Sequence, residues 1–290
     1  MKRLLIGIVL VVLPGTSVDG EEPPRPLVPI AAKLEPTRQV VYKTVGKREL
    51  RLHIFEPKGH RPSDRRPVFL AIHGGGWVGG EARKFYPFAE YFARQGMLGI
   101  SLEYRLISRK SGATNTTVFD CVRDGRSAVR YLRQHARALG IDPARIVVAG
   151  GSAGAQVAAG TALFPKVNAA TDDLKISSTP NALVLFYPVI DTSAEGYGQK
   201  KIGDRWRELS PVHHVRAGVP PTLIFHGTAD TVTPHAGAVR FQKNMRAAGN
   251  PCQLISHPAG PHGYLIFDLK LFEQAMCRTA KFLQQQKILE

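Results

Sequence analysis

The 290-residue sequence contains only three cysteines and, after its first 20 residues, no long hydrophobic run. Three cysteines are too few for a disulfide framework, so an apolar core must hold the fold together. No later stretch approaches the roughly 18 to 20 apolar residues of a membrane span. The composition, 43% hydrophobic and 21% charged, excludes a disordered or fibrous protein and indicates an ordinary globular one.

The first 20 residues carry the pattern of an export signal. Two basic residues, Lys2 and Arg3, precede the short apolar stretch 4–13, which a Pro-Gly pair follows. A basic start, a short apolar stretch and a small residue at Gly20 predict a secretory signal peptide over residues 1–20. The alternatives are a buried N-terminal helix and a membrane anchor. The expected location is secreted or periplasmic.

Export bears on the cysteines and on the segment after the signal. In an oxidising compartment Cys121, Cys252 and Cys277 form at most one disulfide, whose pairing the sequence leaves open, or remain three buried thiols. Residues 21–38 are rich in proline. We expect them to form an extended leader rather than a part of the core.

Acidic residues are scarce: 23 Asp and Glu stand against 39 Lys and Arg, which gives a net charge of +16. For an exported protein such an excess favours an acidic glycan or an anionic cell surface as partner, and not nucleic acid. Alternating spacings of three and four predict a basic stripe along one helix, made of Arg123, Arg126, Arg130, Arg133 and Arg137. The alternative for this stripe is a merely solvated helix face.

From residue 39 onward, strands alternate with helices. Apolar runs predict eight strands, at residues 39–45, 49–56, 67–72, 97–102, 146–150, 182–187, 222–227 and 253–256. Amphipathic or Ala-rich patterns predict helices at residues 86–94, 115–139, 153–163, 234–248 and 268–285. This order demands a mostly parallel sheet with helices on both faces. We expect one domain over residues 39–290, with residues 191–219 as a small cover over the sheet edge.

A turn of small residues follows the strand predicted at residues 146–150. It reads GGSAG, a G-x-S-x-G motif centred on Ser152 between a buried strand and a helix. A nucleophilic serine at such a sharp turn needs small neighbours, because the strained backbone passes close to adjacent strands. We predict Ser152 as a nucleophile; the alternative is a structural turn with an incidental serine.

A second glycine cluster, HGGGW at residues 73–77, follows the strand predicted at residues 67–72. Glycines let backbone N–H groups approach a ligand, and acyl transfer needs two or three such donors for its oxyanion. We assign these donors to Gly75, Gly76 and Ala153. A flexible loop or a phosphate cradle is the alternative, but no Lys-Ser/Thr pair follows to support phosphate.

A nucleophilic serine also needs a histidine base, which in sheets of this kind lies further along the chain. His262 lies in the loop between the last strand and the last helix, where its side chain can reach inward, and we predict it as the base. His257, at the end of that strand, is the runner-up. His213 and His214 fall in the cover segment and are expected to be surface residues.

The base in turn needs a carboxylate that fixes its tautomer. Asp230 follows the strand predicted at residues 222–227 and precedes His262. Its strand is expected to neighbour the strand before His262, so we predict Asp230 as the acid. Asp191, after the strand at residues 182–187, is the competitor.

The motifs HGGGW, GGSAG, HGTAD and PHGY, in this order and spacing, resemble the α/β-hydrolase family. Within it, they are similar to small esterases related to hormone-sensitive lipase and to acetyl and feruloyl esterases. The likeness spans about residues 39–285 and implies an α/β-hydrolase fold and serine-dependent hydrolysis of carboxylic esters, with no metal and no cofactor. It also carries over the catalytic residues Ser152, Asp230 and His262 and the oxyanion donors Gly75, Gly76 and Ala153.

Two departures from the family pattern bear on the substrate. The N-terminal helical cap of many hormone-sensitive-lipase relatives has no room here, and the cover at residues 191–219 is short. We therefore expect an open site for short acyl groups, such as acetyl or feruloyl groups on polysaccharide, or for a small-molecule ester. The alternatives are a serine peptidase of the same sheet type and a non-catalytic binding protein on a hydrolase scaffold.

Overall fold

The computed structural model describes residues 25–107 and 115–290, so the signal peptide expected over residues 1–20 lies outside the described part. The strands match the apolar runs closely, except that the fifth begins earlier. They are β1 (Arg38–Val45), β2 (Arg48–Phe55), β3 (Arg66–Ile72), β4 (Leu98–Leu102), β5 (Ile141–Gly151), β6 (Ala182–Phe186), β7 (Thr222–Gly227) and β8 (Cys252–His257).

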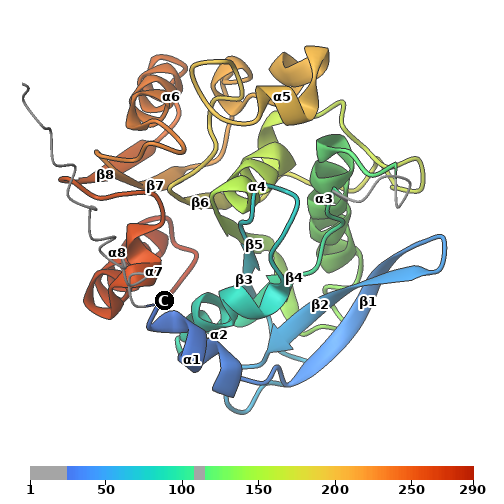
Figure 1. Cartoon of the computed structure of the whole chain (residues 1–290). Coiled ribbons are helices and arrows are strands. Elements are labelled where there is room, and N and C mark those ends of the chain that lie inside the picture. Colours follow the sequence, from blue (N-terminus) through green and yellow to red (C-terminus); the bar gives the residue numbers. More distant parts are fainter. Residues whose placement is uncertain (1–24, 108–114) are drawn as a thin grey trace, which may run out of the picture.

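Helices cover both faces of the sheet, and short helical turns form the cover segment, residues 191–219 (Figure 1). The α-helices are α1 (Leu27–Lys33), α2 (Tyr86–Arg94), α3 (Val118–Gln134), α4 (Ala153–Leu163), α5 (Gln199–Ile202), α6 (His235–Ala247), α7 (Tyr264–Phe267) and α8 (Leu269–Gln285). The 3-10 turns are η1 (Ala82–Phe85), η2 (Asp204–Leu209) and η3 (Pro211–His213).

The eight strands form one sheet in the order β1-β2-β4-β3-β5-β6-β7-β8. β2 runs antiparallel to both of its neighbours, β1 and β4, whereas every other pair is parallel. The predicted mostly parallel sheet with helices on both faces is therefore confirmed. Because parallel strands end at the same edge, the segments after β3, β5, β7 and β8 meet there, and these are the four segments that carry the predicted motifs.

The sheet separates two apolar cores, one on each face, and the central strand β3 contributes side chains to both. Val68, Leu70 and Ile72 join the core beneath α3, α4 and α6, whereas Phe69 and Ala71 join the core beneath α2 and α8. All five side chains are fully buried. Successive side chains of a strand point to opposite faces, so a strand covered by helices on both sides is apolar throughout.

The expected extended leader over residues 21–38 is wrong for its described part. Leu27–Lys33 form helix α1, which buries Leu27 and Ala31. These residues lie four positions apart and so share one face of a helix, and Leu27 packs into the core beneath α2 and α8. Proline did not prevent this, because it is tolerated in the first turn of a helix.

The basic stripe predicted at Arg123, Arg126, Arg130, Arg133 and Arg137 is solvated only at its far end. Arg137 is exposed beyond the end of α3 at Gln134, whereas the other four arginines are buried or half-buried. Arg126 and Arg130 are only 4% and 6% exposed. Arg126 donates to the carbonyls of Gly160 and Thr161 in the last turn of α4, at 3.1 and 2.9 Å, and Arg130 pairs with Asp172 at 2.8 Å. The loop between α4 and β6 folds over the stripe, so these arginines serve internal contacts. An anionic partner stays a prediction from net charge alone.

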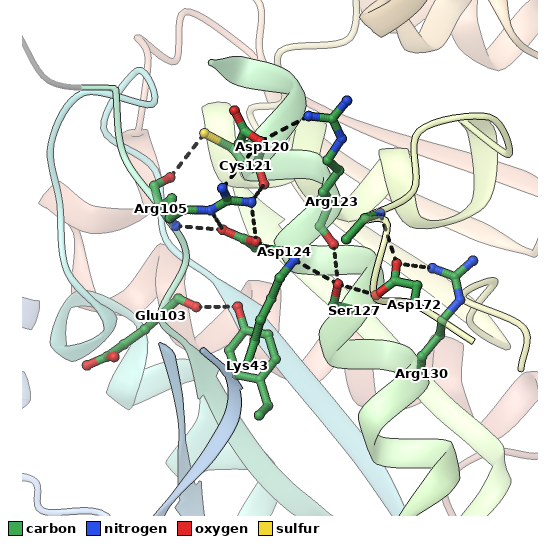
Figure 2. A network of polar contacts seen from close by, with 12 residues as sticks. Lys43, Glu103, Arg105, Asp120, Cys121, Arg123, Asp124, Ser127, Arg130 and Asp172 are labelled. Atoms are coloured by element: carbon green, nitrogen blue, oxygen red, sulfur yellow. Dashed lines mark hydrogen bonds and ion pairs between the residues drawn. The ribbon is translucent and has the colours of Figure 1, made fainter. Parts of the chain in front are cut away.

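A buried ion-pair network joins α3 to β1 and to the segment after β4 (Figure 2). Asp124 of α3 is fully buried and accepts from Lys43 Nζ at 2.8 Å and from Nε and Nη2 of Arg105 at 2.7 and 2.8 Å. Lys43 also donates to Ser127 Oγ at 3.0 Å, and Ser127 donates to Asp172 at 2.6 Å. Buried charges are tolerated here because each has a partner of opposite sign.

Replacing Asp124 by alanine is expected to lower the free energy of unfolding by about 3–5 kcal/mol. The mostly buried Lys43 would lose its only carboxylate partner among the described residues, and Arg105 would keep only its contact with Asp120 at 3.3 Å. Urea denaturation measures the loss. The matched control is Glu56→Ala, which removes a surface pair with Arg38 whose side chains are 23% and 39% exposed. Less than about 1 kcal/mol should be lost there. Equal small losses in both variants would contradict the role of the network.

The disulfide that the sequence left open is not formed in this structure. All three cysteines are free thiols; Cys121 and Cys252 are buried and Cys277 is exposed. Burial raises the pKa of the Cys252 thiol to about 12, so this thiol is protonated at neutral pH.

Within residues 25–107 and 115–290, no helix is both long and apolar enough to cross a membrane.

Candidate active site

Ser152 lies at the sharp turn between β5 and α4. Its φ of 54° and ψ of −121° are values that L-residues rarely adopt. The surrounding contacts fix this conformation: the Ser152 amide donates to the Phe186 carbonyl of β6 at 3.0 Å, and the Ser152 carbonyl accepts from the Val189 amide at 3.1 Å. Strain of this kind persists only where neighbouring structure over-determines it, and it is concentrated at functional sites.

The small residues around Ser152 are required by close backbone approaches. A Cβ on Gly150 would lie 2.4 Å from the Gly154 carbonyl oxygen, and a Cβ on Gly154 would lie 2.3 Å from the Ile72 carbonyl oxygen of β3. Both distances are far below van der Waals contact. The G-x-S-x-G pattern therefore follows from packing α4 tightly against the ends of β3 and β5.

His262 lies in the loop between β8 and α7 and joins the other two predicted residues. Its Nε2 is 3.0 Å from Ser152 Oγ, and its Nδ1 is 2.8 Å from Asp230 Oδ2. One imidazole thus contacts the serine hydroxyl and the carboxylate through opposite ring nitrogens. With the proton on Nδ1 donated to Asp230, Nε2 can accept the serine proton, which is the tautomer that a general base requires.

Asp230 follows β7 and is held on all sides. Its Oδ1 accepts from the amides of Val232 and Thr233 at 2.9 and 2.8 Å, and its Oδ2 accepts from Thr233 Oγ1 at 2.9 Å. Burial raises the pKa of this carboxyl, but hydrogen bonds from His226, His262 and the Thr233 amide together lower the pKa by more than burial raises it. The resulting pKa lies well below the usual range, so Asp230 is ionised at neutral pH.

The competing residues lie elsewhere. Asp191 forms an ion pair with Arg240 instead of contacting a base. His257 stacks on the ring of Tyr264, with centroids 4.6 Å apart and the planes 4° from parallel. His213 contacts a serine hydroxyl within the cover segment. β7 is the neighbour of β8, as predicted, and this adjacency brings Asp230 rather than Asp191 to His262.

The glycine loop, residues 73–77, follows β3 and runs beside the serine. A Cβ on Gly74 would lie 3.1 Å from Ser152 Cβ. Gly75 and Gly76 have φ values of 126° and 61°, in the left-handed region that glycine adopts without strain. The loop therefore passes close to the hydroxyl that a substrate carbonyl would approach.

Three backbone amides next to Ser152 in the chain or on the glycine loop have no hydrogen-bond partner among the described residues. Within the described part of the chain, no carbonyl or side chain accepts a hydrogen bond from the amide of Gly75, Gly76 or Ala153. These are the predicted oxyanion donors, and they lie on the glycine loop and at the first residue of α4. Free amides on two segments that flank one serine are suited to an oxyanion that develops on a substrate carbonyl.

Two further residues contact the predicted catalytic residues Asp230 and His262, although the sequence analysis did not assign them to the site. Thr233 Oγ1 donates to Asp230 and lies 3.2 Å from His262 Nδ1. Tyr187 packs edge-on to His262, with ring centroids 5.3 Å apart. A hydroxyl residue three positions after an aspartate is a signal for a turn stabilised by side chains. An aromatic residue directly after β6, at the functional edge, was the available signal for Tyr187.

The comparisons with known proteins give one family model and several esterases. The BD-FAE family model matches residues 52–245. Esterase LipQ of Mycobacterium tuberculosis is 26% identical over 242 residues, which cover 77% of this chain and 56% of LipQ. Carboxylesterase NlhH of the same organism is 27% identical over 281 residues, which cover 88% of this chain and 85% of NlhH.

Solved structures give the more complete match. The apo form of Thermogutta terrifontis esterase 2 is 39% identical, with a TM-score of 0.82 over 87% of this chain and 96% of that one. Other structures of this esterase, described as propionate-bound and butyrate-bound, have a TM-score of 0.81. The chain spans about half the length of LipQ and of a second M. tuberculosis relative, LipM, at 56% and 50%.

Proposed function

This chain belongs to the BD-FAE family and shares the α/β-hydrolase fold of its esterase relatives, and on that basis we propose that it is a serine carboxylesterase. The observation that carries the proposal is the hydrogen-bonded series Ser152–His262–Asp230 at the carboxyl edge of the sheet. A strained serine, a histidine on its hydroxyl and an ionised carboxylate on the far ring nitrogen are the parts that an acyl-enzyme mechanism requires.

The proposed reaction has two halves. His262 Nε2 removes the proton of Ser152 as Oγ attacks the ester carbonyl carbon, and the amides of Gly75, Gly76 and Ala153 hold the oxyanion. The C–O bond to the alcohol breaks, the imidazolium returns its proton to the leaving alkoxide, and an acyl-serine remains. His262 then takes a proton from water, whose oxygen attacks the acyl carbon. The bond from that carbon to Ser152 Oγ breaks, the imidazolium returns its proton to Oγ, and the carboxylic acid leaves. Asp230 stabilises the imidazolium in both halves.

We further propose that the acyl group is short. The cover segment has only short helical turns, α5, η2 and η3, which offer little apolar surface for a long chain. The propionate-bound and butyrate-bound structures of the T. terrifontis esterase support the same reading for a relative of this chain.

The kcat/KM for p-nitrophenyl acetate or butyrate is expected to exceed that for p-nitrophenyl dodecanoate by at least about tenfold. The extra methylenes of a long acyl chain that contact no apolar surface in the transition state do not strengthen transition-state binding, and they must still be ordered in the site. Initial rates across acetate, butyrate, octanoate and dodecanoate measure this. Strong turnover of long-chain emulsions without turnover of soluble acetate would overturn the short-acyl proposal.

On the alcohol side we propose a sugar, so that the substrates include acetyl or feruloyl groups on polysaccharide. A cavity of about 300 Å³ between the cover segment and α6 is lined by Trp206, His213 and Arg240, among others. An aromatic face beside polar side chains is suited to a sugar ring, which has apolar C–H faces and hydroxyl edges.

The location remains a proposal, and one alternative function is disfavoured. The N-terminal pattern supports a secreted or periplasmic location, although residues 1–20 lie outside the described part. A non-catalytic binding scaffold is disfavoured, because the hydrogen bonds from serine to histidine to aspartate are all present.

A further inference from the structure

The glycine loop is held at its two ends by the segment that follows β4. Tyr104 donates from its hydroxyl to the His73 carbonyl at 2.9 Å, and the Ile107 amide donates to the Trp77 carbonyl at 2.8 Å. Neither contact reaches the middle of the loop. The middle of the loop is closed by its own turn, in which the amides of Val78 and Gly79 donate to the Gly75 carbonyl at 3.2 and 3.1 Å. The segment after β4 donates no hydrogen bond to Gly76, whose amide is a proposed oxyanion donor.

The cover segment supplies the missing contact from outside. Lys201 Nζ donates to the Gly76 carbonyl at 3.3 Å and to the Tyr197 hydroxyl at 2.5 Å. The same ammonium lies 5.9 Å from the centre of the Trp77 ring and 4.6 Å from that of Tyr197. No carboxylate pairs with Lys201 in residues 25–107 and 115–290, so its polar contacts there are directed at the glycine loop and at Tyr197.

The cover segment packs closely against the glycine loop at two points, Gly76 and Gly198. A Cβ on Gly76 would lie 2.6 Å from the Tyr197 hydroxyl, and a Cβ on Gly198 would lie 2.6 Å from Trp77 Cζ3. Glycine is needed on both sides of this contact. The cover segment thus rests on the backbone of the loop itself, not only on its side chains.

A second contact joins the same two segments from inside. Gln156 is fully buried on α4, one turn after the nucleophilic serine. Its Oε1 accepts from Trp77 Nε1 at 3.3 Å, and its Nε2 donates to the Leu209 carbonyl of the cover segment at 3.0 Å. This single amide links the glycine loop, the nucleophile helix and the cover segment.

We propose that the cover segment is a fixed clamp on the glycine loop, in which Lys201 and Gln156 are positioning residues for the oxyanion donors. The clamp contacts Gly76 and Trp77, whose φ values are 61° and 62°. Glycine adopts such a φ freely, but for Trp77 this conformation persists only when neighbouring groups enforce it. Oxyanion stabilisation requires donors that are already in place when charge develops. The inference rests on the proposed esterase function and adds to it a role for the cover segment.

The test compares Lys201→Met with Lys200→Met, a matched control on the neighbouring exposed lysine of α5, and adds Gln156→Met. Loss of one oxyanion donor costs about 10² to 10³ in rate, and partial misplacement should cost less. We expect Lys201→Met to lower kcat for p-nitrophenyl acetate about tenfold with KM and melting temperature unchanged. Lys200→Met should keep the wild-type kcat, and Lys201→Arg should recover part of it.

A trifluoromethyl ketone gives a readout that a merely structural role would not move. Ser152 adds to its carbonyl carbon, the proton passes to His262, and the carbonyl oxygen becomes an oxyanion in the proposed hole. For a transition-state analogue the inhibition constant should rise by the same factor as kcat/KM falls, in Lys201→Met and in Gln156→Met alike.

Two results would overturn the clamp. One is an equal kcat in Lys200→Met and Lys201→Met; the other is a loss confined to KM, with the ketone bound as tightly as by the wild type. Either could occur in a chain whose wild-type form is an active esterase, so the proposed function would stand. A folded wild-type chain that neither hydrolyses the ester nor binds the ketone would overturn both proposals.

Discussion

Replacing Ser152 by alanine should lower kcat for p-nitrophenyl acetate by roughly 10⁴- to 10⁶-fold, because no other group can form the acyl-enzyme. Alanine keeps the Cβ of serine, so the unusual backbone at φ 54° carries the same strain in both proteins. The melting temperature should therefore change little. The loss would then be one of chemistry and not of folding.

The measurement pairs turnover with covalent labelling. Paraoxon should add one phosphoryl group to the wild-type chain, seen by intact mass, and none to the Ser152→Ala variant. Ser193→Ala, in the cover segment, is the matched control and should keep both turnover and labelling. Residual hydrolysis above about 1% in the Ser152→Ala variant would show that another nucleophile performs the reaction.

Replacing Asp230 by asparagine should lower kcat by about 10⁴-fold with modest effect on KM. An asparagine amide can donate to His262 Nδ1, which would place the imidazole proton on Nε2 and leave no acceptor for the serine proton. Asp191→Asn is the matched control, because Asp191 also follows a strand at this edge but pairs with the partly exposed Arg240. Its kcat should stay within about threefold of the wild type. The reverse ranking would make Asp191 the acid.

For the Asp230→Asn variant we also predict how its stability relative to the wild type depends on pH. The folded pKa of Asp230 is depressed, since its hydrogen bonds outweigh the burial that would raise it. The carboxylate therefore contributes stability above its unfolded pKa of about 3.9, and this contribution is lost as pH falls towards the folded value. Asp230→Asn should be less stable than the wild type at pH 7, and the difference should shrink in acid. Thermal denaturation from pH 7 to pH 3 measures it.

The strands and the reactive residues could be predicted from the sequence because each is encoded locally. The apolar runs at β3 and β7 have one consistent explanation, a strand buried on both faces, and the structure places strands there. Ser152 stands directly after β5, Asp230 three residues after β7 and His262 five residues after β8, and the parallel topology brings them together. No long-range information beyond strand adjacency was needed.

What the sequence did not predict depends on contacts between distant segments. The arginine spacing in α3 is that of a surface stripe, yet the loop after α4 covers Arg126 and Arg130. The helix predicted at residues 115–139 is shorter, since α3 ends at Gln134. In the sequence, Gln156 stands out as a long polar residue on an Ala-rich helix. Its two hydrogen-bond partners, Trp77 and the Leu209 carbonyl, are known only from the tertiary structure.

Two arginines at the end of α4, the buried Arg126 and the exposed Arg216, have an electrostatic consequence for this helix. Arg126 caps the carbonyls of Gly160 and Thr161, and Arg216 caps those of Ala162 and Leu163, so the last four carbonyls of the helix meet cations. The aligned peptide dipoles of a helix place partial negative charge at that end and partial positive charge at the other. Because the negative end is neutralised, the potential of α4 at Ser152 is more positive than the helix alone would produce. Part of the chain's excess of arginine thereby favours negative charge at a hydroxyl about 16 Å away, across the 11 residues of α4.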